Sequence, residues 1–201
     1  DAEDKRFALG RRNPVTDPTG RDKILHTFHV VDGKATIQLD EGSYRLVAYR
    51  GISYDAISQE VEVSEDTEVK FVLKRAFETP GQVAVDFSVH TANSIDSWVP
   101  VGIRRQDIAT SGLDVAVVTD LHKVTVLEPI DGGPLLIPGI EVDLNGKKPG
   151  IGRMVVWPMS PDAKIEKSSS DDAIALQMAH WRKLGGEDAI LHQHRNQVAN
   201  P

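Results

Sequence analysis

The stretch A-V-D-F-S-V-H-T-A-N-S-I-D, residues 84–96, is an apolar run that ends in polar residues, and it decides the predicted fold. A second run, V-A-V-V-T-D-L-H (115–122), ends in the same way. Nearly continuous apolar strands that alternate with helices are typical of a parallel α/β sheet or barrel. In such folds, functional groups lie at the carboxyl ends of the strands. We therefore expect a site at these strand ends.

The rest of the C-terminal part fits the same α/β pattern. A third apolar run, P-L-L-I-P-G-I-E-V, covers 134–142, and a fourth, A-I-L-H, covers 189–192. Residues 101–112 predict a short helix that ends at a glycine, and 171–184 predict a longer one, with Ser170 as its N-cap and Gly185 as its terminator. Residues 83–201 are therefore expected to form an α/β barrel-type domain, which is short for a complete barrel.

The N-terminal part has a different pattern. After a polar lead-in (1–20), residues 21–76 alternate between apolar and polar residues, with turn signals such as Asp32-Gly33 between the runs. Several short strands of this kind predict a small antiparallel β-sandwich. Residues 77–82 contain Pro-Gly and read as a linker. The predicted fold class is an α+β chain of two parts, a small antiparallel β-sandwich followed by a partial α/β barrel-type domain.

Composition excludes several classes of function. The chain has 201 residues, a net charge of −7 and no basic cluster, which argues against nucleic-acid and anionic-membrane partners. Its apolar runs are too short for a transmembrane span. The lack of cysteine excludes disulfides, zinc–thiolate sites and thiol nucleophiles. The chain begins Asp-Ala-Glu-Asp, which fits a processed, exported product and equally a tag-cleaved one. An extracytoplasmic location, periplasmic or secreted, is therefore the expectation.

Residue types that bind metals gather at the predicted strand ends. They are Asp86, His90 and Asp96 in the first run and its loop, Asp120 and His122 in the second, Glu141 in the third, and His192 and His194 in the last. Neutral imidazole and carboxylates together suit Zn, Mn or Fe ions, which polarise substrates and activate water. A single strand-end Asp is more often a helix cap or turn former. The residues alone therefore leave an ancestral metal site and a purely structural role both open.

Several phrases together resemble a known family. D-F-S-V-H-T-A-N-S-I-D-S (86–97) and G-L-D-V-A-V-V-T-D-L-H (112–122) resemble the opening of the PHP (polymerase and histidinol phosphatase) superfamily of metallohydrolases. Within this superfamily the chain resembles the CehA/McbA-like group, whose N-terminal transthyretin- or carboxypeptidase-regulatory-like sandwich carries a phrase similar to S-Y-R-L-V-A-Y-R-G-I-S-Y (43–54). Further motifs resemble L-I-P-G-I-E-V, G-R-M-V-V-W-P-M and A-I-L-H-Q-H-R-N. The resemblance runs from about Ala35 to Arg195 and implies a PHP-like barrel-type domain.

The departures from the family pattern concern its metal ligands. The family has ligating histidines where this chain has Ser88 and Arg153, and Leu121 interrupts the family's Asp-His pair. The ligands that the resemblance leaves are His90, Asp120, Glu141 and His194, with Asp86, Asp96 and His122 as supporting residues. Arg153 is expected to pair with Asp86, Asp120 or Glu141, so that guanidinium charge replaces metal charge.

Two functions follow from this resemblance. The first is a degenerate metallohydrolase homologue without cofactor or catalysis, which acts as a structural or interaction subunit beside other proteins in an exported assembly. The second is a hydrolase of phosphoesters or carbamate-like esters with an altered Zn, Mn or Fe site. A small-molecule substrate is expected only in the second case. We favour the first, because two ligands are replaced and a permanent cation is added.

Overall fold

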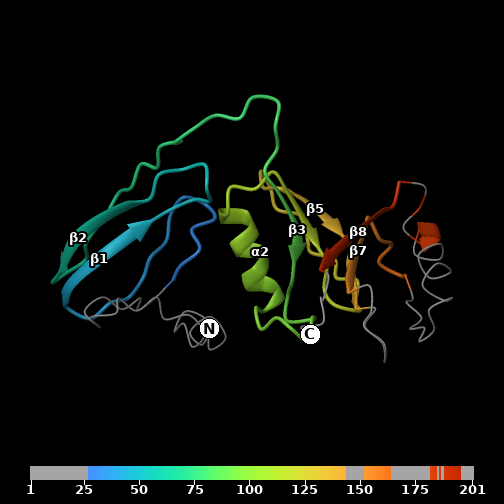
Figure 1. Cartoon of the computed structure of the whole chain (residues 1–201). Helices are drawn as coiled ribbons and strands as arrows, with labels where there is room; N and C mark the ends of the chain where they lie inside the picture. The colour runs from blue at the N-terminus through green and yellow to red at the C-terminus, as the bar shows by residue number, and fades with distance from the viewer. Residues whose placement is uncertain (1–26, 144–151, 164–181, 185, 187, 196–201) are drawn as a thin grey trace, which may run out of the picture. The chain divides into compact units, whose positions relative to one another are not determined.

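In the computed structural model of the protein, the described residues are 27–143, 152–163, 182–184, 186 and 188–195 (Figure 1). The chain divides into two compact units. Unit 1 comprises Asp1–Val83 and Gln106–Leu113, and unit 2 comprises Ala84–Arg105 and Asp114–Pro201. The candidate residues at the strand ends all belong to unit 2.

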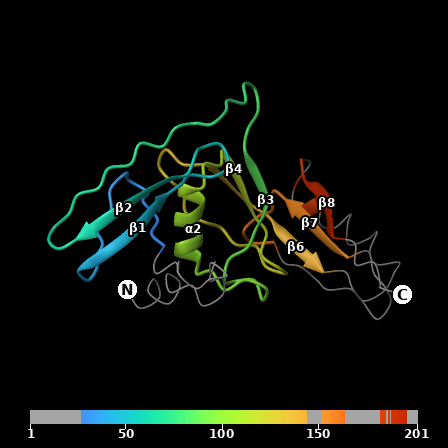
Figure 2. The ribbon, with the colours of Figure 1, turned by 60° about the vertical axis from the view of Figure 1, so that its left-hand side comes forward.

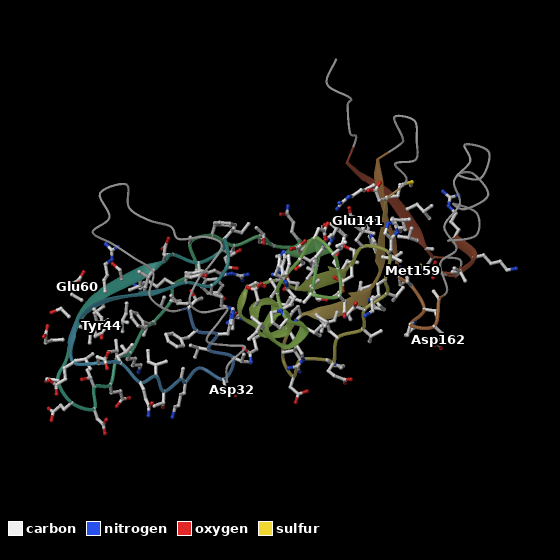
Figure 3. The ribbon with its side chains drawn as sticks, turned by 90° about the horizontal axis from the view of Figure 1, so that it is seen from below. Asp32, Tyr44, Glu60, Glu141, Met159 and Asp162 are labelled. Atoms are coloured by element: carbon white, nitrogen blue, oxygen red, sulfur yellow. The ribbon has the colours of Figure 1, made fainter. Side chains whose placement is uncertain are left out.

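Unit 1 contains an antiparallel pair of strands. Strand β1 (Gly42–Ala48) pairs with β2 (Ile57–Val63) along its whole length. Successive side chains of a strand point to opposite faces, and burial alternates accordingly along β1. Figure 3 shows Tyr44 and Glu60 on opposite sides of this sheet. These two strands were expected from the period-two pattern.

The predicted two-sheet sandwich is wrong for the described part of unit 1, where the named strands form one two-stranded sheet. The neighbouring runs keep their alternating burial, with Ile37, Leu39, Phe71 and Leu73 half-buried, but form no further ladder. An isolated bridge joins Tyr54 to Arg75. A period-two pattern determines which side chains turn inward, whereas hydrogen-bond pairing depends on how the strands meet.

The first sheet of unit 2 is parallel. It has the order β3 (Val85–Val89), β4 (Val115–Val118), β5 (Leu135–Pro138), and the chain passes through helix α2 (Val101–Thr110) between β3 and β4. The apolar runs that open these segments thus form parallel strands, as expected. The predicted helix also forms, and Gly112 follows its end with φ of 74°.

The second sheet of unit 2 is antiparallel, with the order β6 (Ile140–Asp143), β7 (Arg153–Trp157), β8 (Ile190–Arg195) (Figure 2). The predicted α/β barrel is therefore wrong: the described residues of unit 2 form two three-stranded sheets and no closed barrel. Between β6 and β7 lie only residues 144–152. A parallel crossover needs about a dozen residues or more, so this connection returns the chain in the opposite direction.

The two sheets of unit 2 are joined through the chain that runs from β5 into β6. Only Gly139 separates these strands, and its N–H donates to Val118 O at 2.8 Å. Beyond the end of β4, Leu121 forms a parallel bridge with Glu141, and His122 N donates to Glu141 O at 2.7 Å. The extension of β4 therefore lies beside β6, which brings Glu141 to the carboxyl end of the parallel sheet.

One hydrophobic cluster of unit 2 is built on the second sheet. Its buried members are Ile140, Val142, Val156 and Met159, and Val124, Ala163, Leu184 and Leu191 pack against them. In the first sheet, β4 is almost completely buried. Burial of these apolar side chains is the main stabilising contribution to such a unit.

Some expectations lie outside the described residues. These are the lead-in 1–20 and most of the predicted helix 171–184, of which residues 182–184 are described and helical. Within the described parts, none of the helices has the length and apolar character needed to span a membrane.

Candidate functional site

Three chain segments meet where the two sheets of unit 2 join. His90 directly follows β3, Asp120 comes shortly after β4, and Glu141 lies in β6. Because β3 and β4 are parallel, their carboxyl ends lie at the same edge, and the Leu121–Glu141 bridge brings β6 to this edge. Figure 3 labels Glu141 in this crowded part of unit 2. The predicted meeting of strand-end residues is thus present for these segments.

The imidazole of His90 lies between two carboxylates. Its Nδ1 is 2.9 Å from Asp96 Oδ1, and its Nε2 is 2.7 Å from Glu141 Oε2. The second contact has an ion-pair distance but not the alignment of a hydrogen bond, and both of its atoms are buried. Glu141 is the more enclosed partner, with 1% of its side chain exposed. His90 therefore ties the end of β3 both to β6 and to the loop that follows β3.

The guanidinium of Arg153, at the start of β7, contacts the same two carboxylates. Its Nη1 is 2.6 Å from Asp96 Oδ2 and 3.2 Å from Glu141 Oε1. The predicted pairing with Glu141 is present, and Asp96 is an additional partner. We call His90, Asp96, Glu141 and Arg153 the ion-pair cluster. Its charges balance when His90 is protonated, since two carboxylates then face two cations.

The pKa values of the ion-pair cluster reflect these contacts. Burial of the ring lowers the pKa of His90, but Glu141 and Asp96 outweigh this effect and raise it overall. Burial acts to raise the pKa of Asp96, yet hydrogen bonds from Ser94 and Arg153 hold it well below its usual range. The pKa of Glu141 is lowered because His90 and Arg153 outweigh its burial. The hydrogen bond to Asp96 raises the pKa of Arg153. All four groups are thus stabilised in their charged forms.

The ion-pair cluster also fixes loop 91–99, which follows His90. Ser94 Oγ donates to Asp96 Oδ1 at 2.5 Å and accepts from Leu121 N at 2.9 Å. Asp96 is therefore held from within the loop as well as by the cluster. Through Ser94 the loop is also bonded to the chain just beyond β4.

Asp120 is fully buried and makes a separate set of contacts. Its Oδ1 accepts from Thr91 N at 2.6 Å, and its Oδ2 accepts from Thr91 Oγ1 at 2.6 Å and from Thr125 Oγ1 at 2.5 Å. A buried carboxylate needs such donors to offset the loss of water. Although Asp120 was predicted as a metal ligand, its carboxylate connects β4 to the residues after β3 and to Thr125.

The other predicted site residues are Asp86, His122 and His194. Asp86 accepts from the backbone of Ser88, in its own strand, at 2.9 Å. His122 has a left-handed backbone with φ of 59°, immediately after the interrupting Leu121. His194 lies in β8, but its side chain falls outside the described ones.

The described residues do not fit a metal centre in this arrangement. No group of three or more His, Asp or Glu side chains in the described parts of the chain is placed to hold a metal ion. Arg153 contacts the two carboxylates that would attract such an ion, and its permanent charge opposes a nearby dication.

Some contributors to the site were not predicted from the sequence. Arg104 Nε donates to His90 O at 2.8 Å and holds the backbone at the end of β3. Thr91 and Thr125 supply the donors to Asp120. The sequence offers one signal for these donors. Thr91 follows the strand-end His90, and a buried carboxylate at a neighbouring strand end requires hydroxyl or N–H donors. Nothing in the sequence pattern pointed to Thr125 or Arg104.

The chain has no match among protein-family models, curated proteins or solved structures. The resemblance to the PHP superfamily therefore stays a prediction from motifs.

Proposed function

We propose that the chain is a non-catalytic structural or interaction subunit, a degenerate PHP-like metallohydrolase homologue in which the ion-pair cluster stands in place of a metal centre. The observation that carries this proposal is the position of Arg153 Nη1, 2.6 Å from Asp96 Oδ2 and 3.2 Å from Glu141 Oε1. A guanidinium neutralises carboxylates as a cation does, but it offers no coordination site for water or substrate. Other protein subunits are the partners that this role requires.

The state of His90 supports the same proposal. Each of its ring nitrogens faces a carboxylate, and its pKa is raised, which favours the protonated ring. A protonated imidazole has no lone pair for general-base catalysis or for metal binding. Asp120 is likewise occupied, since it accepts hydrogen bonds from two threonines. These polar groups at the strand ends thus form ion pairs and hydrogen bonds within the chain.

One observation favours the alternative, a hydrolase of phosphoesters or carbamate-like esters with an altered metal site. His90 Nε2 and Glu141 Oε2 are buried, 2.7 Å apart and not aligned as a hydrogen bond. Both atoms are of types that ligate Zn, Mn or Fe. Arg153 would have to move away from Glu141 before an ion could bind there.

Metal analysis separates the two functions. We expect the purified protein, dialysed exhaustively without chelator, to contain less than one equivalent of Zn, Mn or Fe, and its melting temperature to stay unchanged when Zn or Mn is added. A full equivalent that is lost in His90→Ala would replace the proposal with the hydrolase alternative. A screen of phosphoester substrates would then be the next assay.

Restoring the two family ligands tests the origin of the site. We expect the double variant Ser88→His with Arg153→His to gain a Zn-dependent rise in melting temperature, because it removes the cation and adds two imidazoles. The single variant Ser88→His is the control, since it retains Arg153 and should show no such rise. If the double variant gains no Zn binding, the relation to an ancestral metal centre is wrong.

A further inference from the structure

Loop 91–99 exposes two large apolar side chains. Ile95 is 85% exposed and Trp98 is 65% exposed. Isolated apolar residues on a surface are ordinary, so exposure alone identifies no function. A role in binding would require that the loop backbone hold these two side chains in fixed positions.

The backbone of loop 91–99 is fixed by contacts at both of its ends. Ala92 N donates to Val99 O at 2.6 Å, which closes the loop on itself. Asn93 Nδ2 donates to Thr125 Oγ1 at 3.2 Å, and Asn93 Oδ1 accepts from Lys123 Nζ at 2.9 Å. The loop is therefore bonded to the segment that follows β4.

The middle of the loop is fixed by the ion-pair cluster. Asp96 follows Ile95 directly and lies two residues before Trp98, and its carboxylate contacts both His90 and Arg153. Ser97 Oγ donates to His90 O at 3.3 Å. The exposed apolar residues thus project from a backbone that is already ordered. Such preorganisation lowers the entropy lost when a loop binds a partner.

The chemistry of the loop indicates what it would bind. Its sequence, T-A-N-S-I-D-S-W-V, contains no Lys or Arg, and its single charged residue, Asp96, is already paired. Peripheral attachment to anionic membranes relies on basic residues beside the apolar ones, so this loop is poorly suited to it. Its polar side chains are bonded within the chain, which leaves apolar contact for a partner to supply. The net charge of −7 favours a partner with a neutral or basic rim.

We infer that loop 91–99 is a docking surface whose Ile95 and Trp98 insert into an apolar pocket, with a neutral or basic rim, on a partner protein. The ion-pair cluster holds the loop in its binding shape. This inference rests on the proposed function, because it names the surface through which an interaction subunit would act. Aromatic anchors such as tryptophan are typical of the residues that dominate binding energy at protein interfaces.

A photo-crosslinking residue at position 95, introduced in the source organism, identifies the partner. Position 52 is the matched control, because Ile52 is an isoleucine of similar exposure, 87%, in unit 1. We expect a specific protein adduct from position 95 and not from position 52. No adduct from position 95, or the same adducts from both positions, would overturn the inference.

Binding of the purified captured protein then provides the decisive measurement. We expect Ile95→Ser and Trp98→Ser each to raise the dissociation constant about tenfold or more, which corresponds to a loss of about 1.4 kcal/mol in binding free energy. The matched controls Ile52→Ser and Tyr49→Ser, the latter at a side chain that is 67% exposed, should leave it within about twofold. Equal affinities for all four variants would contradict a docking role for the loop.

Two further measurements separate the remaining outcomes. Arg153→Met removes no contact residue, so a weaker affinity in this variant supports preorganisation by the ion-pair cluster. Sedimentation with vesicles of phosphatidylcholine, alone or mixed with phosphatidylglycerol, tests a lipid surface; binding that Trp98→Ser abolishes would replace the protein partner with a membrane. If crosslinking fails while metal analysis finds no bound ion, the docking surface is wrong and the non-catalytic proposal stands.

Discussion

At the scale of single residues, the proton on His90 links the stability of unit 2 to pH. The pKa of His90 is raised in the folded protein, so its contribution is complete below the unfolded value of about 6.5 and is lost as pH rises through the folded value. We therefore expect the melting temperature of the wild type, relative to His90→Gln, to fall as pH rises from about 6 to about 9. Taking the difference between the two proteins removes the effects of other groups. A constant difference would contradict a raised pKa.

Arg153 is expected to stabilise the folded protein through its contacts with carboxylates. Without its guanidinium, the enclosed carboxylate of Glu141 keeps His90 as its one cationic partner among the described residues. We expect Arg153→Met to lower the free energy of unfolding by about 1–3 kcal/mol, measured with urea, because one buried charge loses a partner. Arg153→Lys keeps the charge without the planar donor fork and should lose less. Unchanged stability in Arg153→Met would place the pair among the many ion pairs that contribute nothing measurable.

Asp120 is expected to stabilise the protein as a buried hydrogen-bond acceptor and not as a member of the ion-pair cluster. In Asp120→Asn, an amide group would face donors from Thr91 and Thr125, which leaves buried donors without an acceptor. We expect a loss of about 1–3 kcal/mol in unfolding free energy. Asp86→Asn is the control at an exposed strand position and should change it by less than about 0.5 kcal/mol. Similar losses in both variants would contradict this role.

The sequence predicted some of the residues of the candidate site but not their contacts. His90, Asp96 and Glu141 were predicted because metal-ligating types at strand ends are recognisable locally, and Arg153 because it replaces a family histidine. Their contacts were not predictable, since Arg153 and Asp96 are 57 positions apart and meet only through strand pairing. Asp120 has contacts other than those expected because a buried carboxylate binds the donors closest to it.

At the scale of the elements, Gly139 decides how the two sheets of unit 2 join. A Cβ atom there would lie 2.9 Å from Val156 O and 3.0 Å from Trp157 Cβ. We expect Gly139→Ala to destabilise the protein by about 1–3 kcal/mol, because backbone atoms would have to shift. Gly102→Ala is the matched control, since its Cβ would meet nothing within 4 Å and alanine favours the helix. Equal stability in the two variants would mean that the junction adapts freely.

The strands themselves were more predictable than their pairing. The runs that became β3, β4 and β8 were recognised because apolar continuity is a local property of the sequence. The single strand predicted over 134–142 is wrong, because Gly139 divides it into β5 and β6, which belong to different sheets. Strand β7 was not predicted, although its residues M-V-V-W are apolar. The antiparallel direction of β6 and β7 follows from the short connection between them, whereas the motif resemblance implies a barrel of parallel strands.

At the scale of the whole molecule, the two units differ in how much apolar surface they bury. Among the described residues of unit 1, Ile108 is the one buried side chain, whereas unit 2 contains a core that includes Ile140 and Val156. A unit with little burial gains less stability from the hydrophobic effect. It should therefore open before a unit with a complete core.

The aromatic residues allow the two units to be followed separately during unfolding. Tyr44, Tyr49 and Tyr54 are the chain's 3 tyrosines and all belong to unit 1, whereas its 3 tryptophans all belong to unit 2. We expect the tyrosine bands of the near-ultraviolet circular dichroism spectrum to be lost at a lower urea concentration than the tryptophan bands. Val156→Ala should move the tryptophan transition alone to lower urea, because it leaves a cavity in the core of unit 2. Coincident transitions, shifted together by this variant, would instead show that the chain unfolds as a single cooperative body.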